Sequence, residues 1–208
     1  MKTAQEDRRI KRTKKLLKEA LTDLLLERDL KQITVTDLVD RADLNRGTFY
    51  LHYRDIYDLL NEMADTLLHD FDRLVKEYFS MKSEGSSYTI GSKAFDYVYE
   101  NQRICRALFL SPHGMHFIDE FKQIIIRRVL NQDPFKNNNK NHEPDQRLLY
   151  EYLSCFVAGG LVSILTAWLK DGKDLPKESV VSAIDRILYD VLTPDHLFAR
   201  IQDSRALL

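Results

Sequence analysis

The chain has 208 residues, 44% of them hydrophobic, and its 31 Lys and Arg nearly balance its 32 Asp and Glu. A chain of this length and apolar content can bury a real core in one or two globular domains. Seven Gly and five Pro are few, which favours an all-α fold over β-rich folds with many turns. No stretch approaches about 18 uninterrupted apolar residues and the N-terminus carries no apolar signal region, so we expect a cytoplasmic protein with no membrane partner.

Charge is unevenly distributed along the chain. Residues 1–54 hold 13 Lys and Arg against 9 Asp and Glu, a net charge of +4, which leaves −5 for the remaining residues. The N-terminal part could therefore favour a polyanion. A basic helix face that is merely solvated explains the same charge equally well, so a sequence motif is needed to decide between these two interpretations.

The first elements in chain order are short helices. Residues 1–9 are expected to be a mobile arm, and apolar residues then recur at helical spacing over residues 10–28. Thr34 followed by Asp37 matches a capping box for a short second helix. Asn45 can cap a short third helix in the same way.

A long fourth helix is predicted over residues 55–79, followed by a loop over residues 81–87. The polar stretch 131–146 is expected to be a flexible excursion because it has almost no apolar anchor. Helical patterns fill the rest of the second half, over residues 88–100, 103–110, 115–130, 147–170 and 177–192.

The most informative segment is residues 34–53, TVTDLVDRADLNRGTFYLHY. Two short helices separated by only a few residues cannot pair as antiparallel neighbours, so they must cross steeply, which is the geometry of a helix-turn-helix. The apolar residues of the pair would form its small shared core: Val35, Leu38, Val39, Leu44 and Phe49. The remaining residues of the third helix then point away from that core: Arg46, Gly47, Thr48, Tyr50, Leu51 and His52.

These outward residues suit a DNA groove. Arg46 can donate to guanine O6 and N7, and Leu51 can contact a thymine methyl group. Thr48, Tyr50 and His52 can bond phosphates that fix the register of the protein on the duplex. Their position at the start of the third helix matches the part of a recognition helix that enters the major groove.

The run Gly47-Thr48-Phe49-Tyr50-Leu51-His52-Tyr53, between a short capped helix and a long helix, resembles the TetR family of regulators. The resemblance covers about residues 8–68. It implies an all-α fold in which an N-terminal three-helix helix-turn-helix domain is joined by a long helix to a C-terminal helical bundle. With the cap residue Asn45 and with Arg54, the expected DNA contacts are Thr36, Asn45, Arg46, Gly47, Thr48, Tyr50, Leu51, His52 and Arg54. A similar helical pair with no role in DNA binding is the alternative interpretation.

Two positions depart from the family pattern. The turn of the family usually carries a glycine where this chain has Asp43, and Asp tolerates the left-handed conformation at modest cost. A lysine that is common near the start of the fourth helix is Ile56 here. We expect Arg54 and the backbone N–H groups at the start of that helix to supply the phosphate contact instead.

Residues 69–208 more distantly resemble the C-terminal domain of many Firmicute members of the family, through Phe156-Val-Ala-Gly-Gly160 and Ala167-Trp168-Leu169-Lys-Asp-Gly172. The resemblance implies a regulatory and dimerisation domain whose last two long helices pair with their copies in a homodimer. The helix over residues 147–170 is apolar on nearly every side, which also indicates burial on two faces. The expected interface residues are Phe156, Gly160, Ile164, Trp168, Ile184 and Leu188. The alternative is the core helix of a monomer, in which Gly159 and Gly160 serve close helix packing.

Aromatic residues of the second part could line a cavity for a small effector, as the resemblance suggests. The candidates are Phe95, Tyr99, Phe109, Phe117, Phe121, Tyr150 and Trp168. Aromatic residues at helical spacing also form plain cores, and the sequence leaves the two interpretations equally open.

Other chemistry-bearing residues carry little signal. His113 and His116 have the spacing of metal ligands but lie beside Pro112 and Gly114 without nearby partners, so we expect no metal site. Cys105 and Cys155 lie far apart in apolar helical contexts, and we expect both to be buried small hydrophobes rather than a disulfide. No catalytic motif, phosphate loop or cofactor fingerprint is recognisable, so no cofactor is expected.

Together these features predict a sequence-specific transcriptional regulator that binds double-stranded DNA at a palindromic operator as a homodimer. We expect a repressor whose operator binding is modulated by a small-molecule effector through the C-terminal domain. An activator or coactivator that works through protein contacts is the second hypothesis. A helical enzyme is the third, and it would need a convergent set of perturbed titratable groups that the sequence does not offer.

Overall fold

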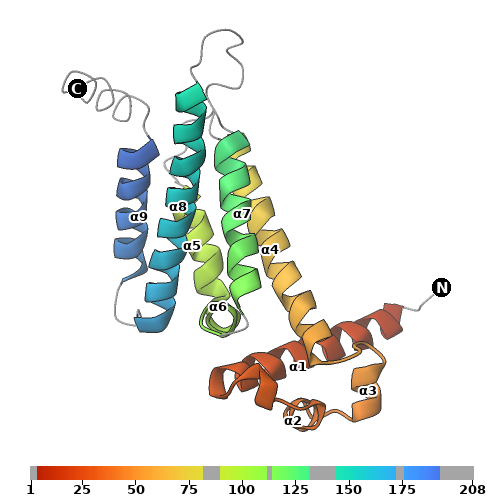
Figure 1. The fold of residues 1–208 in the computed structure, drawn as a ribbon. Helices are drawn as coiled ribbons and strands as arrows, with labels where there is room; N and C mark the ends of the chain where they lie inside the picture. Colours follow the sequence, from red (N-terminus) through yellow and green to blue (C-terminus); the bar gives the residue numbers. More distant parts are fainter. Residues whose placement is uncertain (1–3, 82–89, 112–113, 132–143, 172–175, 193–208) are drawn as a thin grey trace, which may run out of the picture. The chain divides into compact units, whose positions relative to one another are not determined.

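The computed structural model describes residues 4–81, 90–111, 114–131, 144–171 and 176–192, and every regular element in these ranges is a helix (Figure 1). This confirms the all-α prediction. The elements are α1 (Ala4–Glu27), the 3-10 helix η1 (Leu30–Gln32), α2 (Val35–Arg41), α3 (Arg46–Tyr50), α4 (Ile56–Met81), α5 (Ile90–Glu100), α6 (Gln102–Phe109), α7 (Met115–Asn131), α8 (Pro144–Asp171) and α9 (Lys177–Leu192).

Two predicted boundaries are wrong. Helix α1 begins at Ala4, so the mobile arm expected over residues 1–9 is helical from that residue on. Ala, Gln, Glu and Arg in this segment are strong helix formers, and a charged surface turn needs no apolar stripe. Helix α8 begins at Pro144, where proline is tolerated in the first turn, so the polar stretch ends in helix. Residues 82–89 and 132–143, which include most of the predicted loop and excursion, lie outside the described residues.

Packing divides the chain into two compact units. The first comprises Met1–Asp70 with Asn101–Phe121, and the second comprises Phe71–Glu100 with Lys122–Leu208. The division after residue 70 lies close to the boundary predicted at residue 68. The inclusion of α6 in the first unit was not predicted, because it depends on contacts between residues far apart in the sequence.

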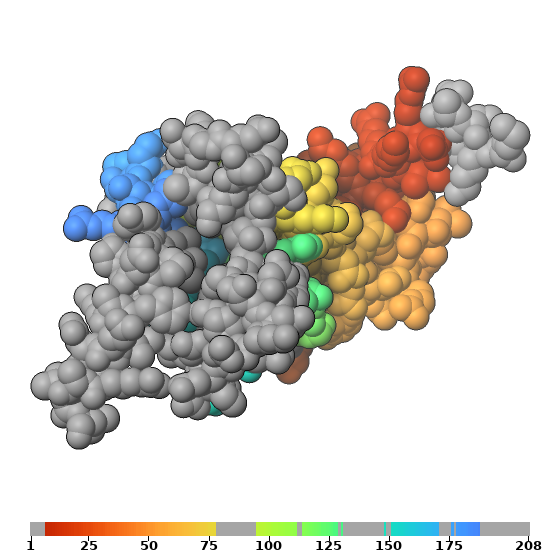
Figure 2. Space-filling model, turned by 90° about the horizontal axis from the view of Figure 1, so that it is seen from above, coloured from red at the N-terminus to blue at the C-terminus, as the bar shows by residue number. Residues whose placement is uncertain are grey.

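The first unit is built around one apolar cluster shared by α1, α2, α3 and the first half of α4. Leu17, Leu21, Leu38, Phe49 and Leu59 are completely buried in it. In Figure 2 the red surface of α1 lies beside the orange surface of later residues of this unit, and Lys14 of α1 pairs with Glu62 of α4 at 2.6 Å. This cluster fixes the two short helices of the motif on a scaffold of two long ones.

The second unit has its own core, in which α5 contacts both α8 and α9. The rings of Phe95 and Trp168 meet edge to face with centroids 4.7 Å apart, and Phe95 is fully buried. Arg128 of α7 donates to both carboxylate oxygens of Asp72 of α4, with Nε to Oδ1 2.9 Å and Nη2 to Oδ2 2.5 Å. This two-point ion pair ties α7 to the second half of α4.

Helix α8 is more apolar than the sequence analysis allowed. Its segment Glu151–Lys170 is long and apolar enough to cross a membrane, judged by length and composition alone. Core helices of globular proteins can have the same composition. One side of this helix is packed inside the second unit, with Val157, Ala158 and Leu165 buried.

Candidate nucleic-acid interface

Helix α2 starts with the predicted capping box. The backbone N–H of Thr34 donates to Asp37 Oδ2 at 2.8 Å, and the backbone N–H of Asp37 donates to Thr34 Oγ1 at 3.2 Å. Hydrogen bonds from the Thr34 hydroxyl and backbone N–H, with a further contribution from Arg28, lower the pKa of Asp37 to about 2. The backbone N–H groups at the start of α2 and the charge of Asp37 therefore both have partners.

The turn between α2 and α3 depends on Asp43. Its φ of 53° is the only positive φ of a non-glycine residue in the described part of the chain. The backbone N–H of Asp43 donates to Asp40 O at 3.3 Å, and that of Leu44 donates to Val39 O at 2.9 Å. These bonds close the C-terminus of α2, so Asp43 does the work that glycine usually does in such a turn.

Helix α3 is capped by Asn45, as predicted. Its Oδ1 accepts from the backbone N–H of Thr48 at 2.7 Å and from the Thr48 hydroxyl at 3.0 Å. The Thr48 hydroxyl has a single proton, which this bond uses, so it cannot also donate to a phosphate in this conformation. Asn45 and Thr48 therefore hold the helix in place.

Outward and inward residues of α3 separate as expected. Phe49 is completely buried, whereas Tyr50 is 58% exposed and Leu51 is 80% exposed. Arg46 and Gly47 are exposed as well. A Cβ at Gly47 would come within 3.3 Å of Asn45 Oδ1, so a larger residue would press on the cap. Three side chains, those of Arg46, Tyr50 and Leu51, thus form the accessible surface of the helix.

Arginines around the motif differ in their partners. Arg28 pairs with Asp37 at 3.2 Å, Arg41 with Glu27 at 2.8 Å and Arg54 with Asp58 at 3.4 Å. Arg46 instead donates from Nη2 to the hydroxyl of Thr36, which is half-buried on α2. Of these four side chains, Arg46 is therefore the one not paired with a carboxylate among the described residues.

The start of α4 differs from expectation in one respect. Ile56, at the position where the family commonly has lysine, is buried in the core of the first unit. The backbone N–H of Asp58 already donates to Asp55 Oδ1 at 2.8 Å, and that of Arg54 donates to Asp58 Oδ2 at 3.0 Å. Two carboxylates thus occupy the helix start that we expected to offer free N–H groups. The Arg54 side chain itself is highly exposed and remains a phosphate candidate.

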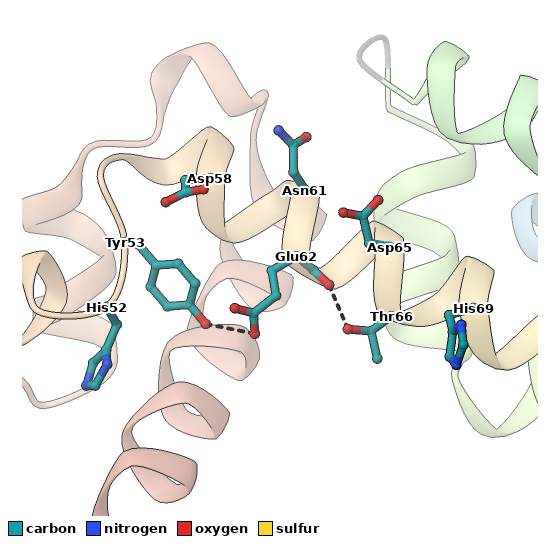
Figure 3. Close-up of a pocket in the computed structure, with 8 residues that line it drawn as sticks. All are labelled: His52, Tyr53, Asp58, Asn61, Glu62, Asp65, Thr66 and His69. Atoms are coloured by element: carbon teal, nitrogen blue, oxygen red, sulfur yellow. Dashed lines mark hydrogen bonds between the residues drawn. The ribbon is translucent and has the colours of Figure 1, made fainter.

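An open groove of about 500 Å³ lies beside the motif, lined by His52, Tyr53, Asp58, Asn61, Glu62, Asp65, Thr66 and His69 (Figure 3). Asp58 and Asp65 place negative charge in the same groove as His52. His52 is therefore a weaker candidate for a phosphate contact than Tyr50.

Glu62 is the centre of a polar network that the sequence analysis missed. It accepts from Lys14 Nζ at 2.6 Å and from the Tyr53 hydroxyl at 3.2 Å, and it pairs with Lys18 Nζ at 2.9 Å (Figure 3 shows the Tyr53 bond). Burial opposes ionisation of Glu62, but the hydrogen bonds from both lysines outweigh it and lower the pKa of Glu62 to about 2. Burial, with the nearby charge of Glu62, raises the pKa of Tyr53. The spacing of Lys14 and Lys18 by one helical turn was the available signal.

Of the seven aromatic residues proposed as a ligand pocket, three belong to the first unit and four to the second. In the first unit, Phe109, Phe117 and Phe121 are buried and pack against one another, with centroids 5.2 to 6.2 Å apart. In the second unit, Phe95 and Tyr99 contact Trp168. The rings of each cluster touch directly, as in ordinary core packing. The side chain of Tyr150 lies outside the described residues.

The proposed interface residues are placed unequally. Phe156 is 68% exposed and Gly160 is exposed, whereas Ile164 and Trp168 are half-buried. Ile184 is only 3% exposed, so within the subunit it is a core residue and not part of an accessible face. The side chain of Leu188 lies outside the described residues. Two further apolar residues are exposed on these helices, Tyr152 on α8 and Ile187 on α9, and the sequence analysis did not select them.

One of the two cysteine predictions is wrong. Cys105 is buried, and burial raises the pKa of its thiol to about 12. Cys155 is free and exposed, on the same side of α8 as Tyr152 and Phe156. Because α8 is apolar all round, its sequence pattern does not show which side faces the core.

The fold and the exposed surface of α3 define the class of protein. Two short helices, each with its own N-cap, lie on an all-helical scaffold, and the second exposes an arginine, a tyrosine and a leucine. This arrangement is that of a helix-turn-helix DNA-binding protein. Two family models match the chain. The model for bacterial regulatory proteins of the tetR family matches residues 17–63, and the model for a transcriptional regulator C-terminal region matches residues 86–190. The chain belongs to the TetR family of transcriptional regulators.

Individual relatives agree with this assignment. An uncharacterised HTH-type transcriptional regulator of Bacillus subtilis strain 168, YxbF, is 40% identical over an alignment of 173 residues. The alignment covers 79% of this chain and 41% of the relative. The chain thus spans about two fifths of the length of that curated relative. A putative TetR-family regulator from Syntrophomonas wolfei has a TM-score of 0.64 at 14% identity, covering 88% of this chain and 97% of its own. The dihydroxyacetone kinase operon activator DhaS has a TM-score of 0.54 at 21% identity, covering 85% and 93%. At these identities the solved structures support the fold alone.

Proposed function

We propose that this regulator is a cytoplasmic, homodimeric repressor that binds a palindromic operator through α3 and is released by a small effector acting on the second unit. The observation that carries the DNA-reading part is the exposure of Arg46, Tyr50 and Leu51 on a helix whose orientation is fixed by buried Phe49 and the Asn45 cap. A rigid helix with only three outward side chains is suited to reading a short half-site.

Each of the outward residues has a distinct role in this proposal. Arg46 donates two hydrogen bonds to guanine O6 and N7, and Leu51 contacts a thymine methyl group. Tyr50 and Arg54 bond phosphates and thereby fix the register. Gly47 lets the DNA backbone approach the helix closely because no side chain intervenes.

A five-residue helix contacts few base pairs, so specific binding requires two copies of the protein on a two-fold symmetric site.

The exposed side of α8 fits a second copy of the chain. Tyr152 and Phe156 are 65% and 68% exposed there, and no charged residue occurs between Glu151 and Lys170. An uncharged aromatic face of this kind is typical of a homodimer interface and is unsuited to a nucleic acid.

Glycines on the same face support close approach of that copy. A Cβ at Gly159 or at Gly160 would meet nothing within 4 Å inside the subunit. Glycine in a helix interior nevertheless costs about 1 kcal/mol relative to alanine. Packing inside the chain therefore does not account for two consecutive glycines, whereas a neighbouring helix from the partner would.

Regulation is proposed to run through the two helices shared by both units. The division between units falls inside α4 and inside α7, so a change of packing in the second unit can act on either helix. An effector shifts DNA affinity only if it binds the two states differently. An activator is the second candidate, because DhaS, a structural relative, carries the name of an operon activator.

Selection of bound sites from random duplexes tests the DNA-reading proposal directly. The full-length protein should select a sequence with two-fold symmetry. Its affinity should fall steeply with salt: the logarithm of the binding constant should decrease with the logarithm of the salt concentration, with a slope of about −0.9 for each phosphate neutralised. Selection of no sequence, or of one without symmetry, would contradict the proposal.

Two variants then separate base reading from phosphate binding. Arg46→Ala should cost about 1 to 3 kcal/mol at one base pair of each half-site and relax specificity there. Tyr50→Phe should weaken binding to all duplexes by a similar factor and leave the selected sequence unchanged. The same specificity profile for both variants would overturn the assignment of roles.

A further inference from the structure

We propose that Thr36 is a positioning residue for base recognition: its hydroxyl accepts a hydrogen bond from the Arg46 guanidinium and holds it ready for a guanine. Thr36 would then contribute to specificity through Arg46, in addition to any contact of its own with DNA. This inference rests on the proposed function of α3 as the reading helix.

The hydrogen bond joins two helices that are fixed independently of it. Thr36 is the second residue of α2, whose start is locked by the Thr34–Asp37 capping box. Arg46 is the first residue of α3, which is locked by the Asn45 cap. Phe49 and Leu38, both completely buried, hold the two helices against the same core. The distance between the hydroxyl and the arginine backbone is therefore set by the fold and not by the side chains themselves.

Thr36 is an unusual partner in this neighbourhood because it is neutral. Arg28, Arg41 and Arg54 are each paired with a carboxylate, which competes with DNA for the guanidinium. A hydroxyl takes only one of the five N–H donors of Arg46 and leaves its charge unbalanced. The remaining donors can still form the two parallel bonds to guanine O6 and N7.

The hydroxyl of Thr36 also keeps its own proton when it accepts from Arg46. The side chain can therefore donate to a phosphate while it orients the arginine. Arginine loses much rotamer freedom when it is fixed in one geometry, and a side chain that is already held loses less on binding. The expected gain is in discrimination between bases, because only the guanine complex uses the fixed geometry.

A double-mutant cycle on the selected operator tests this inference. The variants are Thr36→Val, which keeps the shape of the side chain but removes the acceptor, Arg46→Ala, and the two combined. Thr36→Ser is the conservative control because it retains a hydroxyl. Thr66→Val is the matched control because the Thr66 hydroxyl donates to the backbone of its own helix, at Glu62 O. Affinity is measured for operators that carry each of the four bases at the position where Arg46→Ala loses its preference.

Thr36→Val should reduce the preference for guanine at that position by about threefold to tenfold, the effect of one hydrogen bond. It should have no effect on base preference when Arg46 is already alanine, and Thr36→Ser and Thr66→Val should behave as the wild type. The inference is overturned if Thr36→Val lowers affinity equally for all four bases, if it relaxes a different base pair, or if its effect persists in the Arg46→Ala background. If the wild-type protein selects no sequence, the proposed function falls first, and this inference falls with it.

Discussion

Glu62 pairs with two lysines of α1 and accepts a hydrogen bond from a buried tyrosine, so one carboxylate holds three groups in place. Because its pKa in the folded state, about 2, lies below the ordinary value of 4.5, its charge stabilises the fold above pH 4.5. That contribution is lost as the pH falls from about 4.5 towards 2, because in this range the carboxyl group of the unfolded chain takes up a proton and that of the folded chain does not. Asp37, whose pKa is also about 2, acts in the same direction.

Replacement of Glu62 by glutamine should therefore reduce the dependence of stability on pH. At pH 7 Glu62→Gln should destabilise the protein by about 1 kcal/mol, a modest figure because the side chain is partly exposed to solvent. Below pH 4 the variant and the wild type should approach each other. Urea denaturation between pH 3 and pH 7 measures both effects.

Glu19→Gln is the control for this experiment. Glu19 forms an exposed pair with Lys15 at 3.8 Å, one helical turn away, and its loss should change stability by less than about 0.5 kcal/mol at any pH. Parallel curves for Glu62→Gln and the wild type across the whole pH range would show that the network around Glu62 has no stabilising role.

The turn between α2 and α3 contains one residue in an unfavourable backbone conformation. Asp43 adopts a φ of 53°, which is unfavourable for a residue with a Cβ unless a short polar side chain eases it. Asp43→Ala should destabilise the protein by about 1 kcal/mol, because alanine has no polar side chain to support the left-handed conformation. Asp43→Gly should be at least as stable as the wild type, since the gain in the turn offsets the greater freedom of glycine in the unfolded chain.

Asp40→Ala gives the comparison for a neighbouring aspartate in ordinary helical conformation. It should not destabilise the protein, because Asp40 is exposed on α2 and alanine is a better helix former. Thermal unfolding of the three variants ranks them. If Asp43→Ala were as stable as the wild type, the turn would not be strained in solution.

At the scale of the whole molecule, the reactivity of the Cys155 thiol can be used to test the proposed dimer interface. Its thiol is exposed in the subunit, beside Phe156, whereas Cys105 is buried. A dimer through this face should protect Cys155 from alkylation at micromolar protein concentration, and Phe156→Glu should restore its reactivity together with the monomer, since an unpaired buried charge is costly. Mass spectrometry of the alkylated protein distinguishes the two thiols. Rapid reaction of Cys155 in a dimeric wild type would place the interface elsewhere.

Gly160→Ala offers an independent measure of the same surface. In an isolated subunit the added methyl group meets nothing within 4 Å, and alanine should stabilise the helix by about 1 kcal/mol. In a closely packed dimer the methyl group should instead push the two copies apart and weaken association. Sedimentation equilibrium and thermal unfolding together separate these effects, and a variant that is both more stable and equally dimeric would argue against close packing at this glycine.

The proposed regulation also predicts a change in the spacing of the two reading helices. Helix α4 has 26 residues and is about 39 Å long at 1.5 Å per residue, so a small tilt displaces its end appreciably. Spin labels at residue 40, an exposed position on α2 to which no DNA contact is assigned, should be placed in a Cys155→Ser background. They should give a broad distance distribution that narrows when the operator fixes the half-sites about 34 to 36 Å apart. An unchanged distribution would mean that regulation does not act through this spacing.

Local features of this protein were predictable from its sequence because their causes lie within a few residues. The Thr34–Asp37 capping box, the Asn45 cap and the inward position of Phe49 all depend on spacings of three or four residues. The class of motif and the outward position of Arg46, Tyr50 and Leu51 follow from the same spacings. These features were sufficient to indicate a DNA-binding regulator of the TetR type.

Features that join distant residues were decided by the tertiary structure. Glu62 meets Lys14, 48 residues away, and Arg46 meets Thr36 only because both helices rest on a common core. Which unit each of the seven aromatic residues belongs to also depends on contacts between residues far apart in the sequence. Helix α8 is apolar on every side, so its periodicity does not identify its buried face. Which of Cys155, Phe156 and Val157 faces the core is settled only by the neighbouring helices, because the hydrophobic effect rewards burial without specifying direction.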